Sequence, residues 1–352
     1  MRIVIDINHP AHVHFFKNFI WKMQEKGHVI TITATEKDLN LKLLDSYNFK
    51  YLSLGSYGNN IFKKIVSVPY IDLKMYTAIK KFRPDLLLGF GSIRAAHVSK
   101  MLGKPSIIFD DDEYSYPYYA PFASAICGFS GFKKSGKKIL HLNSFKELAY
   151  LHPNYFKPVK KIENYNEYAL VRFVSWKAFH DVGKKGFDAA SKDQLIKTLS
   201  KYTNILISSE GQLPAEYEGY KIKSSINQIH NIIANANLLI CDSQTMTTEA
   251  GVLGTPAIRC NSFVGKDDMG NFIELENKYN LIYNYQNHSQ AITKAVELLQ
   301  KQNLKEEWKL KRDKLLKDKI DVTAFMLWFI ENYPKSFQRM KNDSIVNHGE
   351  NI

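Results

Sequence analysis

Several features that would narrow the function are scarce in this chain of 352 residues. Only three cysteines occur, Cys127, Cys241 and Cys260, and their wide spacing excludes the close pairs of a disulfide framework or a zinc site. No apolar run approaches the roughly 20 residues that span a bilayer, and the first residues form a strand pattern rather than a signal peptide. The sequence therefore predicts a reduced, cytoplasmic protein.

Glycine and proline are also few, at 18 and 11 residues, so the chain is not a low-complexity linker. Neither a G-x-G-x-x-G fingerprint nor a Walker A loop occurs, which disfavours dinucleotide dehydrogenases and P-loop enzymes. The apolar fraction, 45%, is ample for about two domains. Lys and Arg number 48 against 35 Asp and Glu, and this net charge of +13 favours nucleotides, nucleic acid or an anionic membrane as partners without choosing among them.

Short apolar runs alternate with amphipathic stretches in the first 110 residues. The pattern predicts strands at residues 2–7, 29–34, 51–54, 85–90 and 106–109. It predicts helices at residues 12–26, 39–44, 71–82 and 93–102. Strands that alternate with helices indicate a parallel sheet covered on both faces.

A second series follows the polar, aromatic stretch at residues 154–167. It predicts strands at residues 168–174, 204–208, 238–241 and 256–259, and helices at residues 192–199, 226–236, 245–253 and 289–319. Two such series predict an α/β protein with two doubly wound, Rossmann-like domains that face each other across a cleft. We expect these domains at residues 1–160 and 161–320, then a helix at 321–334 that packs back on a domain, and a frayed polar tail at 335–352.

Three histidines lie within six residues just after the first strand. His9, His12 and His14, with Asn8 before them, open the first helix at the edge of the sheet where helix amides attract anions. They are candidates for catalysis or substrate binding, and the alternative is a capped turn with solvated histidines. A metal site is disfavoured because His12 and His14 are two residues apart, whereas a helical pair of ligands needs a spacing of three or four.

Four consecutive acids, residues 110–113, follow the strand at residues 106–109. Crowded carboxylates raise one another's pKa and can provide a general base or bind a cation, and Asp111 and Glu113 are the candidate bases. The equally weighted alternative is an acidic helix N-terminus exposed to solvent.

Polar residues also follow the strands of the second half. Arg172 ends the first of them and Glu210 follows the second, while Ser243, Gln244, Thr245 and Met246 begin the helix after the third. Amides and hydroxyls at a helix start can hold a diphosphate, and Glu249, a turn further in, can accept hydrogen bonds from ribose hydroxyls. The alternatives are an ordinary capped helix and, for Arg172, a structural salt bridge.

The run from Ile240 to Ile258 resembles the nucleotide-sugar motif of GT-B glycosyltransferases, especially the transferase that adds N-acetylglucosamine to the lipid-linked muropeptide. It also resembles the related non-hydrolysing UDP-N-acetylglucosamine 2-epimerases. The segments DINHPAHVHFFKN, VRFVSW and SSEGQLP are more similar to an uncharacterised prokaryotic family of predicted GT-B proteins, over nearly the whole chain. This resemblance implies a GT-B-like fold.

The resemblance also implies roles for individual residues. Residues 243–246 would lie against the diphosphate, Glu249 would hold the ribose, and Arg172 stands where GT-B proteins often have a basic diphosphate contact. His12 stands where the muropeptide transferase has a histidine after its first loop, so we expect it to assist the acceptor hydroxyl.

Together these features predict a metal-independent glycosyltransferase without a cofactor, which moves a sugar from a nucleotide diphosphate such as UDP to a glycan or lipid-linked acceptor in cell-surface glycan synthesis. Two Phe and four Lys at residues 128–138 would suit contact with the inner face of the membrane, although a solvated loop is the favoured explanation. One alternative is a UDP-N-acetylglucosamine 2-epimerase. The other is a non-catalytic binder of anionic surfaces or nucleic acid, and nucleic acid is disfavoured because the basic residues are scattered.

Overall fold

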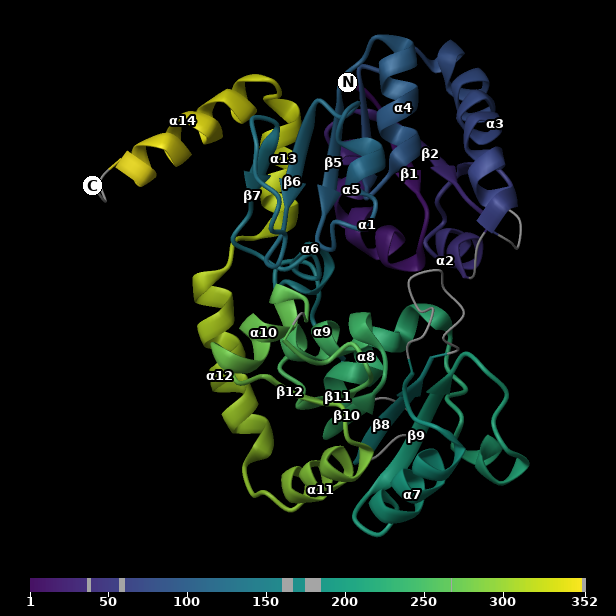
Figure 1. The fold of residues 1–352 in the computed structure, drawn as a ribbon, viewed down its shortest axis with the longest axis vertical. Coiled ribbons are helices and arrows are strands. Elements are labelled where there is room, and N and C mark those ends of the chain that lie inside the picture. Colours follow the sequence, from purple (N-terminus) through teal and green to yellow (C-terminus); the bar gives the residue numbers. More distant parts are fainter. Residues whose placement is uncertain (37–38, 57–60, 160–166, 175–184, 267, 350–352) are drawn as a thin grey trace. The chain divides into compact units, whose positions relative to one another are not determined.

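The computed structural model describes residues 1–36, 39–56, 61–159, 167–174, 185–266 and 268–349 (Figure 1). The chain divides into two compact units. The first comprises Met1–Tyr150 and Ile320–Ile352, and the second comprises Leu151–Lys319. The domain boundary expected at residues 160 and 161 lies outside the described residues, as do Ser175 and Trp176 of the VRFVSW segment.

The first unit is built on a parallel sheet of seven strands in the order β3-β2-β1-β4-β5-β6-β7. The strands are β1 (Arg2–Ile7), β2 (Val29–Ala34), β3 (Tyr51–Ser53), β4 (Leu86–Phe90), β5 (Ser106–Asp110), β6 (Ala125–Gly128) and β7 (Ile139–His141). Every residue of β4 and β5 is buried, because helices cover both faces of a parallel sheet.

Helices from both ends of the chain complete the first unit. They are α1 (Pro10–Glu25), α2 (Asn40–Ser46), α3 (Ile61–Ile79), α4 (Ile93–Leu102), α5 (Tyr116–Tyr119), α6 (Leu148–Leu151), α13 (Val322–Glu331) and α14 (Lys335–Gly349). Helix α13 packs against α1, and Glu331 forms ion pairs with Lys26 at 2.6 Å and His28 at 3.1 Å. The last part of the chain thus belongs to the unit that the first part begins.

The second unit is built on a parallel sheet of five strands in the order β12-β11-β10-β8-β9. The strands are β8 (Tyr168–Phe173), β9 (Asn204–Ser209), β10 (Leu238–Cys241), β11 (Ala257–Cys260) and β12 (Ile282–Tyr285). The α-helices are α7 (Ala189–Leu199), α8 (Ile229–Asn235), α9 (Gln244–Leu253), α10 (Gly270–Asn277), α11 (His288–Leu299) and α12 (Leu304–Asp318), and short 3-10 turns lie at Ala215–Tyr220 and Ile226–Gln228. Among the residues that the structure describes, no helix is long and apolar enough to cross a bilayer.

Three sequence predictions differ from the structure. The helix predicted at 71–82 begins ten residues earlier, at Ile61, and has Pro69 inside it, where a proline usually breaks or starts a helix. The single helical stretch predicted at 289–319 is two helices, α11 and α12. The tail predicted to fray is helix α14, where Ser336 Oγ donates to the carbonyl oxygen of Phe329 at 2.6 Å and ties the first turn to α13.

The chain order reverses once in each sheet. Strand β1 lies between β2 and β4, and strand β8 lies between β9 and β10. The connections that leave two such neighbouring strands diverge, and ligands of doubly wound proteins bind in the resulting crevice at the carboxyl ends of the strands. The fold therefore predicts ligand sites at the carboxyl ends of β1 and β4 in the first unit and of β8 and β10 in the second.

Candidate functional site

A buried carboxylate, Asp6, lies near the end of β1 at the reversal point of the first sheet. Arg94 of α4 donates to it from Nη2 to Oδ1 at 2.9 Å and to Oδ2 at 3.1 Å, and from Nε to Oδ2 at 3.2 Å. Ser92 Oγ donates to Oδ2 at 2.6 Å and Thr33 Oγ1 donates to Oδ1 at 2.8 Å. Asp6 and Arg94 are almost completely buried, so their charges depend on each other and on these hydrogen bonds.

The predicted substrate ligand Asn8 is joined to this charge pair. Its Nδ2 donates to Asp6 Oδ2 at 3.0 Å, and its Oδ1 accepts from Thr35 Oγ1 at 3.1 Å and from Arg94 Nη2. Both ends of the amide are therefore bonded within the protein. Asn8 fixes the loop before α1 in this structure, and direct contact with a substrate stays a prediction.

Two of the three histidines have local structural partners. His9 is the N-cap of α1, where its Nδ1 accepts from the backbone N–H of Ala11 at 3.2 Å. His14 is buried, with its Nδ1 3.2 Å from the hydroxyl of Tyr47 and its ring stacked on Tyr150 at a centroid distance of 5.4 Å. The cap made by His9 fits the capped-turn alternative, whereas His14 is buried and not solvated as that alternative expected. Substrate binding by either residue stays a prediction.

His12 and a lysine that pairs with the predicted acid Asp111 both approach the ring of Phe90, the last residue of β4. The His12 ring lies 5.2 Å from the Phe90 ring, and the ammonium of Lys146 lies 5.4 Å from the same ring. Lys146 donates to Asp111 Oδ2 at 2.5 Å. The sequence analysis missed Lys146 because it lies 35 residues beyond Asp111, with no local motif around it. The structure thus gathers His12 and the Lys146–Asp111 pair at the carboxyl edge of the sheet.

The ion pair with Lys146 affects how Asp111 could act. Burial disfavours the Lys146 ammonium, but the charges of Asp111 and Glu147 outweigh burial and raise the pKa of Lys146. Glu113, the other candidate base, accepts from the backbone N–H groups of Lys134 at 2.7 Å and of Lys133. Each candidate carboxylate therefore has a partner that it would have to share with an acceptor, and their role as bases stays a prediction.

Crowding of acids has its clearest effect at Asp110. Burial, then the charge of exposed Asp112, raise the pKa of Asp110 to about 7. The hydroxyl of Tyr119 donates to Asp110 Oδ2 at 2.5 Å and opposes this shift. The raised carboxyl pKa expected from the acidic run is therefore found at its first, most buried member, and burial is the larger cause.

Asp110→Asn should stabilise the protein at pH 8 and leave it unchanged near pH 4. The folded state keeps Asp110 protonated up to about pH 7, whereas the unfolded chain ionises it near its ordinary pKa of 3.8, so its contribution to stability is lost as the pH rises between these values. Three units of pKa correspond to about 4 kcal/mol as an upper bound. Thermal unfolding of both proteins at pH 4, 6 and 8 measures the difference. An equal gain at all three values would contradict the assignment, and Asp45→Asn, which removes an exposed carboxylate elsewhere in the same unit, is the matched control.

In the second unit, two predicted site residues form a pair at the end of β8. Arg172 Nη1 donates to Ser208 Oγ at 2.8 Å, and its Nη2 is ion-paired with Glu210. The Arg172 side chain is 18% exposed and that of Glu210 is 44% exposed, so solvent reaches the pair. This arrangement is compatible with both roles considered for Arg172, a structural salt bridge and a diphosphate contact.

The helix predicted to hold a diphosphate, α9, follows β10, the strand next to β8 at the same reversal point. Ser243 is its N-cap and accepts from the backbone N–H of Met246 at 3.4 Å, while the Met246 side chain is buried. Gln244 and Thr245 are partly exposed in the first turn. Asp242, just before the cap, accepts from the backbone N–H of Val174 at 2.8 Å and joins the two strand ends.

Glu249, the predicted ribose ligand, has a partner that the sequence analysis missed. His230 of α8 lies with its Nε2 3.0 Å from Glu249 Oε1, and both side chains are almost completely buried. The residues are 19 positions apart and belong to different helices, so no spacing rule indicates the pair. Ribose binding by Glu249 stays a prediction.

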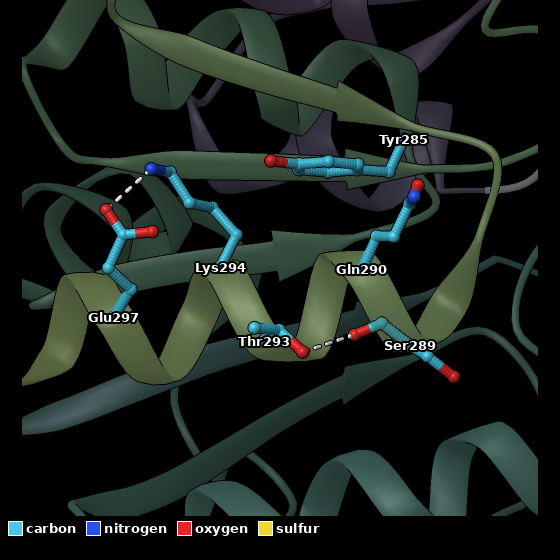
Figure 2. A pocket seen from close by; sticks show the side chains of 6 residues that line it. All are labelled: Tyr285, Ser289, Gln290, Thr293, Lys294 and Glu297. Carbon is cyan, nitrogen blue, oxygen red and sulfur yellow. Dashed lines mark hydrogen bonds and ion pairs between the residues drawn. The ribbon is translucent and has the colours of Figure 1, made fainter.

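A shallow hollow of about 390 Å³ lies on α11 of the second unit (Figure 2). Tyr285 lies over the helix, and Lys294 is paired with Glu297 at 2.7 Å. The lining is polar and none of the predicted site residues contributes to it. Within the described ranges, no group of three His, Cys, Asp or Glu side chains could hold a metal ion.

Comparisons with known proteins agree with this architecture. Residues 1–118 match a family model described as "Protein of unknown function (DUF354)". An uncharacterized protein of Methanocaldococcus jannaschii is 25% identical over 111 residues, 32% of this chain and 33% of that protein. The chain thus aligns with about a third of the length of this curated relative.

Solved structures resemble nearly the whole chain. The glycosyltransferase VinC in complex with dTDP has a TM-score of 0.63 at 9% identity, with 94% of this chain and 99% of VinC covered. MurG of Acinetobacter baumannii has a TM-score of 0.58 at 13% identity, covering 94% and 99%, and the UDP-GlcNAc 2-epimerase of M. jannaschii has 0.57 at 13%, covering 89% and 99%. The chain therefore has a GT-B-like α/β fold with two Rossmann-like units.

Proposed function

We propose that the protein is a glycosyltransferase that moves a sugar from a nucleotide diphosphate, UDP in the first instance, to an acceptor in cell-surface glycan synthesis. This proposal rests on the reversal point of the second sheet. Arg172 lies near the end of β8 there, and the first turn of α9 follows the neighbouring strand β10. A guanidinium and helix amides suit a leaving diphosphate. The proposal places the enzyme in the cytoplasm, with a lipid-linked or glycan acceptor at the inner face of the membrane.

The first unit would then bind the acceptor. His12 would accept the proton of the attacking hydroxyl or polarise that hydroxyl. Arg172 and the α9 amides would stabilise the negative charge that develops on the diphosphate as the sugar leaves. This division of work requires no metal ion. It also gives Asp111 a secondary role, because its ion pair with Lys146 would have to open before it could accept a proton.

A thermal-shift screen against UDP, dTDP and GDP sugars tests the donor assignment. A ligand that binds only the folded state raises its stability by RT ln(1 + [L]/Kd), about 2.7 kcal/mol at a hundredfold excess over Kd. The ligands that stabilise the protein are then incubated with acceptor fractions, and release of the nucleoside diphosphate is measured. The absence of any shift with all donors at millimolar concentration would refute the proposal.

A 2-epimerase is the second candidate, because the chain resembles the solved UDP-GlcNAc 2-epimerase over its length. Such an enzyme acts on the nucleotide sugar alone. Incubation with UDP-N-acetylglucosamine in heavy water, without acceptor, separates the two. Exchange at C2 of the sugar favours the epimerase, and acceptor-dependent release of UDP favours the transferase.

Glu249→Ala should weaken binding of the nucleoside diphosphate by roughly 2 to 4 kcal/mol, the cost of two hydrogen bonds to a charged acceptor. Calorimetric titration with UDP measures the loss, and Glu297→Ala, which removes an exposed carboxylate of the same unit, is the control. Unchanged affinity in a folded variant would instead assign Glu249 to its pair with His230 alone.

A further inference from the structure

A row of polar residues crosses the second sheet near its carboxyl edge. Arg172 is in register with Ser208 on one side and with Cys241 on the other, Cys241 with Arg259, and Arg259 with Asn284. Residues in register on parallel strands project to the same face of the sheet. One residue from each of the five strands therefore lies on this face.

The hydrogen bonds follow the same row. Arg172 Nη1 donates to Ser208 Oγ at 2.8 Å, and Arg259 Nε donates to Asn284 Oδ1 at 2.8 Å. Between the arginines, Cys241 Sγ lies 3.1 Å from Thr247 Oγ1, so the row is on the side of the sheet that α9 covers. The two guanidinium groups consequently flank the strand from which α9 begins.

Arginine is scarce in this chain, with seven residues among 48 basic ones, so two arginines in one row are a notable concentration. Their planar groups donate in fixed directions, unlike the ammonium of lysine. The guanidinium of Arg259 is fully buried, stacked on Phe272 at 3.5 Å and ion-paired with Asp268. This arginine is therefore fixed in position before any ligand arrives.

Each arginine also has one buried N–H donor that is unpaired among the described residues. Arg172 Nε and Arg259 Nη1 have no hydrogen-bond partner within the part of the chain that the structure describes. Buried donors are nearly always paired, because leaving one unpaired costs stability. Two such donors on either side of Cys241 point to a group that accepts from both.

The start of α9 adds a further preference for negative charge. Cys241 ends β10, and α9 begins three residues later at Gln244, so the positive end of the helix dipole lies at the same edge as the two guanidinium groups. The exposed carboxylate of Glu210 already pairs with Arg172. An anion that reaches the row from solvent would compete with this carboxylate.

We propose that Arg259 joins Arg172 and the first turn of α9 in one binding site for a diphosphate, with Glu210 as an internal competitor that the ligand displaces. This inference rests on the proposed function for its biological ligand, the diphosphate of a nucleotide sugar. Its chemistry is independent of sugar and acceptor, since inorganic pyrophosphate presents the same charged groups. The site therefore can be tested without turnover.

Pyrophosphate and UDP titrations of folded variants test the site directly. Arg259→Gln and Arg172→Gln should each weaken binding of both ligands at least tenfold, whereas uridine affinity should not change. Lys197→Gln, which removes an exposed charge on α7, is the control for net charge and should have no effect. Glu210→Gln should strengthen pyrophosphate binding several-fold, and weaker binding would overturn its role as competitor.

A labelling experiment on the unaltered protein covers the case in which the buried Arg259 variant does not fold. With ¹⁵N-arginine the spectrum contains seven Nε–H signals, from Arg2, Arg83, Arg94, Arg172, Arg259, Arg312 and Arg339. Pyrophosphate should shift the signals of Arg172 and Arg259 and leave the buried Arg94 of the first unit unchanged. A titration that moves Arg172 alone would remove Arg259 from the site.

The outcomes also separate this inference from the proposed function. Pyrophosphate binding that depends on both arginines, without any response to nucleotide sugars, would support the anion site and reject the transferase. Nucleotide-sugar affinity that is unchanged in Arg259→Gln would support the transferase and reject the inclusion of Arg259 in the site. Orthophosphate is the third probe, and affinity equal to that for pyrophosphate would assign the row to a single phosphate group.

Discussion

His12→Ala is expected to lower the turnover number by about 100-fold to 10,000-fold, the usual contribution of a general acid or base, while the affinity for the donor stays nearly constant. The His12 ring lies beside Phe90 in the first unit, whereas the predicted diphosphate contacts belong to the second unit. Steady-state rates with saturating donor, together with UDP titrations, measure the two quantities separately.

The pH profile distinguishes two ways in which His12 could act. Its Nδ1 accepts from the backbone N–H of Asn8 at 3.4 Å, a hydrogen bond that a neutral ring can accept only with its proton on Nε2. A base at Nε2 requires that long contact to open, and the rate should then fall as the pH drops and the imidazole becomes protonated. A ring that polarises the hydroxyl by donating from Nε2 should keep its rate at low pH.

His141→Ala is the matched control for this experiment, because His141 is an exposed histidine of the same unit and is not among the predicted site residues. It should change the rate by far less than the catalytic variant. A His12→Ala enzyme that keeps its rate would transfer the base assignment to Asp111 or Glu113. One that loses donor affinity instead would contradict the acceptor-side role.

Arg94→Met is expected to lower the free energy of unfolding of the first unit by about 3 to 5 kcal/mol, because it leaves the buried Asp6 carboxylate without its counter-charge. The Met side chain retains most of the apolar packing, so the loss reports on charge. Urea denaturation followed by circular dichroism measures it.

Lys22→Met provides the comparison for the charge-pair variant, since the Lys22–Glu25 pair is exposed and should contribute less than about 1 kcal/mol. The double variant Asp6→Leu with Arg94→Met should be more stable than Arg94→Met alone, because it removes both charges. Similar losses for the exposed and buried pairs would show that the Asp6 cluster does not hold the loop before α1.

Local signals in the sequence predicted much of the secondary structure that positions the candidate site. Strand β1 and helix α1 follow from a β-branched run and from apolar residues at helical spacing, and the start of α9 follows from its hydroxyl residues. Strands β6 and β7 were missed because no helix separates them, and β12 was missed because its residues IYNY are mostly half-buried and form no apolar run.

The partners of the predicted residues depend on tertiary packing and could not be read from spacing. Asp6 and Arg94 are 88 positions apart, and they meet only because β4 lies next to β1 in the sheet. The place of Arg259 beside Cys241 likewise requires the register of β10 and β11. Sequence motifs identified where ligands are expected to bind, whereas strand order decides which charges meet there.

The position of helix α13 in the chain decides when the first unit can be completed during synthesis. It packs on α1 and donates from Thr323 Oγ1 to the carbonyl oxygen of Ala149 at 2.7 Å, a carbonyl that also accepts from Asn18 of α1. The intervening Leu151–Lys319 forms the second unit. The whole second unit must therefore be synthesised before α13 can cover its surface on α1. The first unit is started before the second and is completed after it.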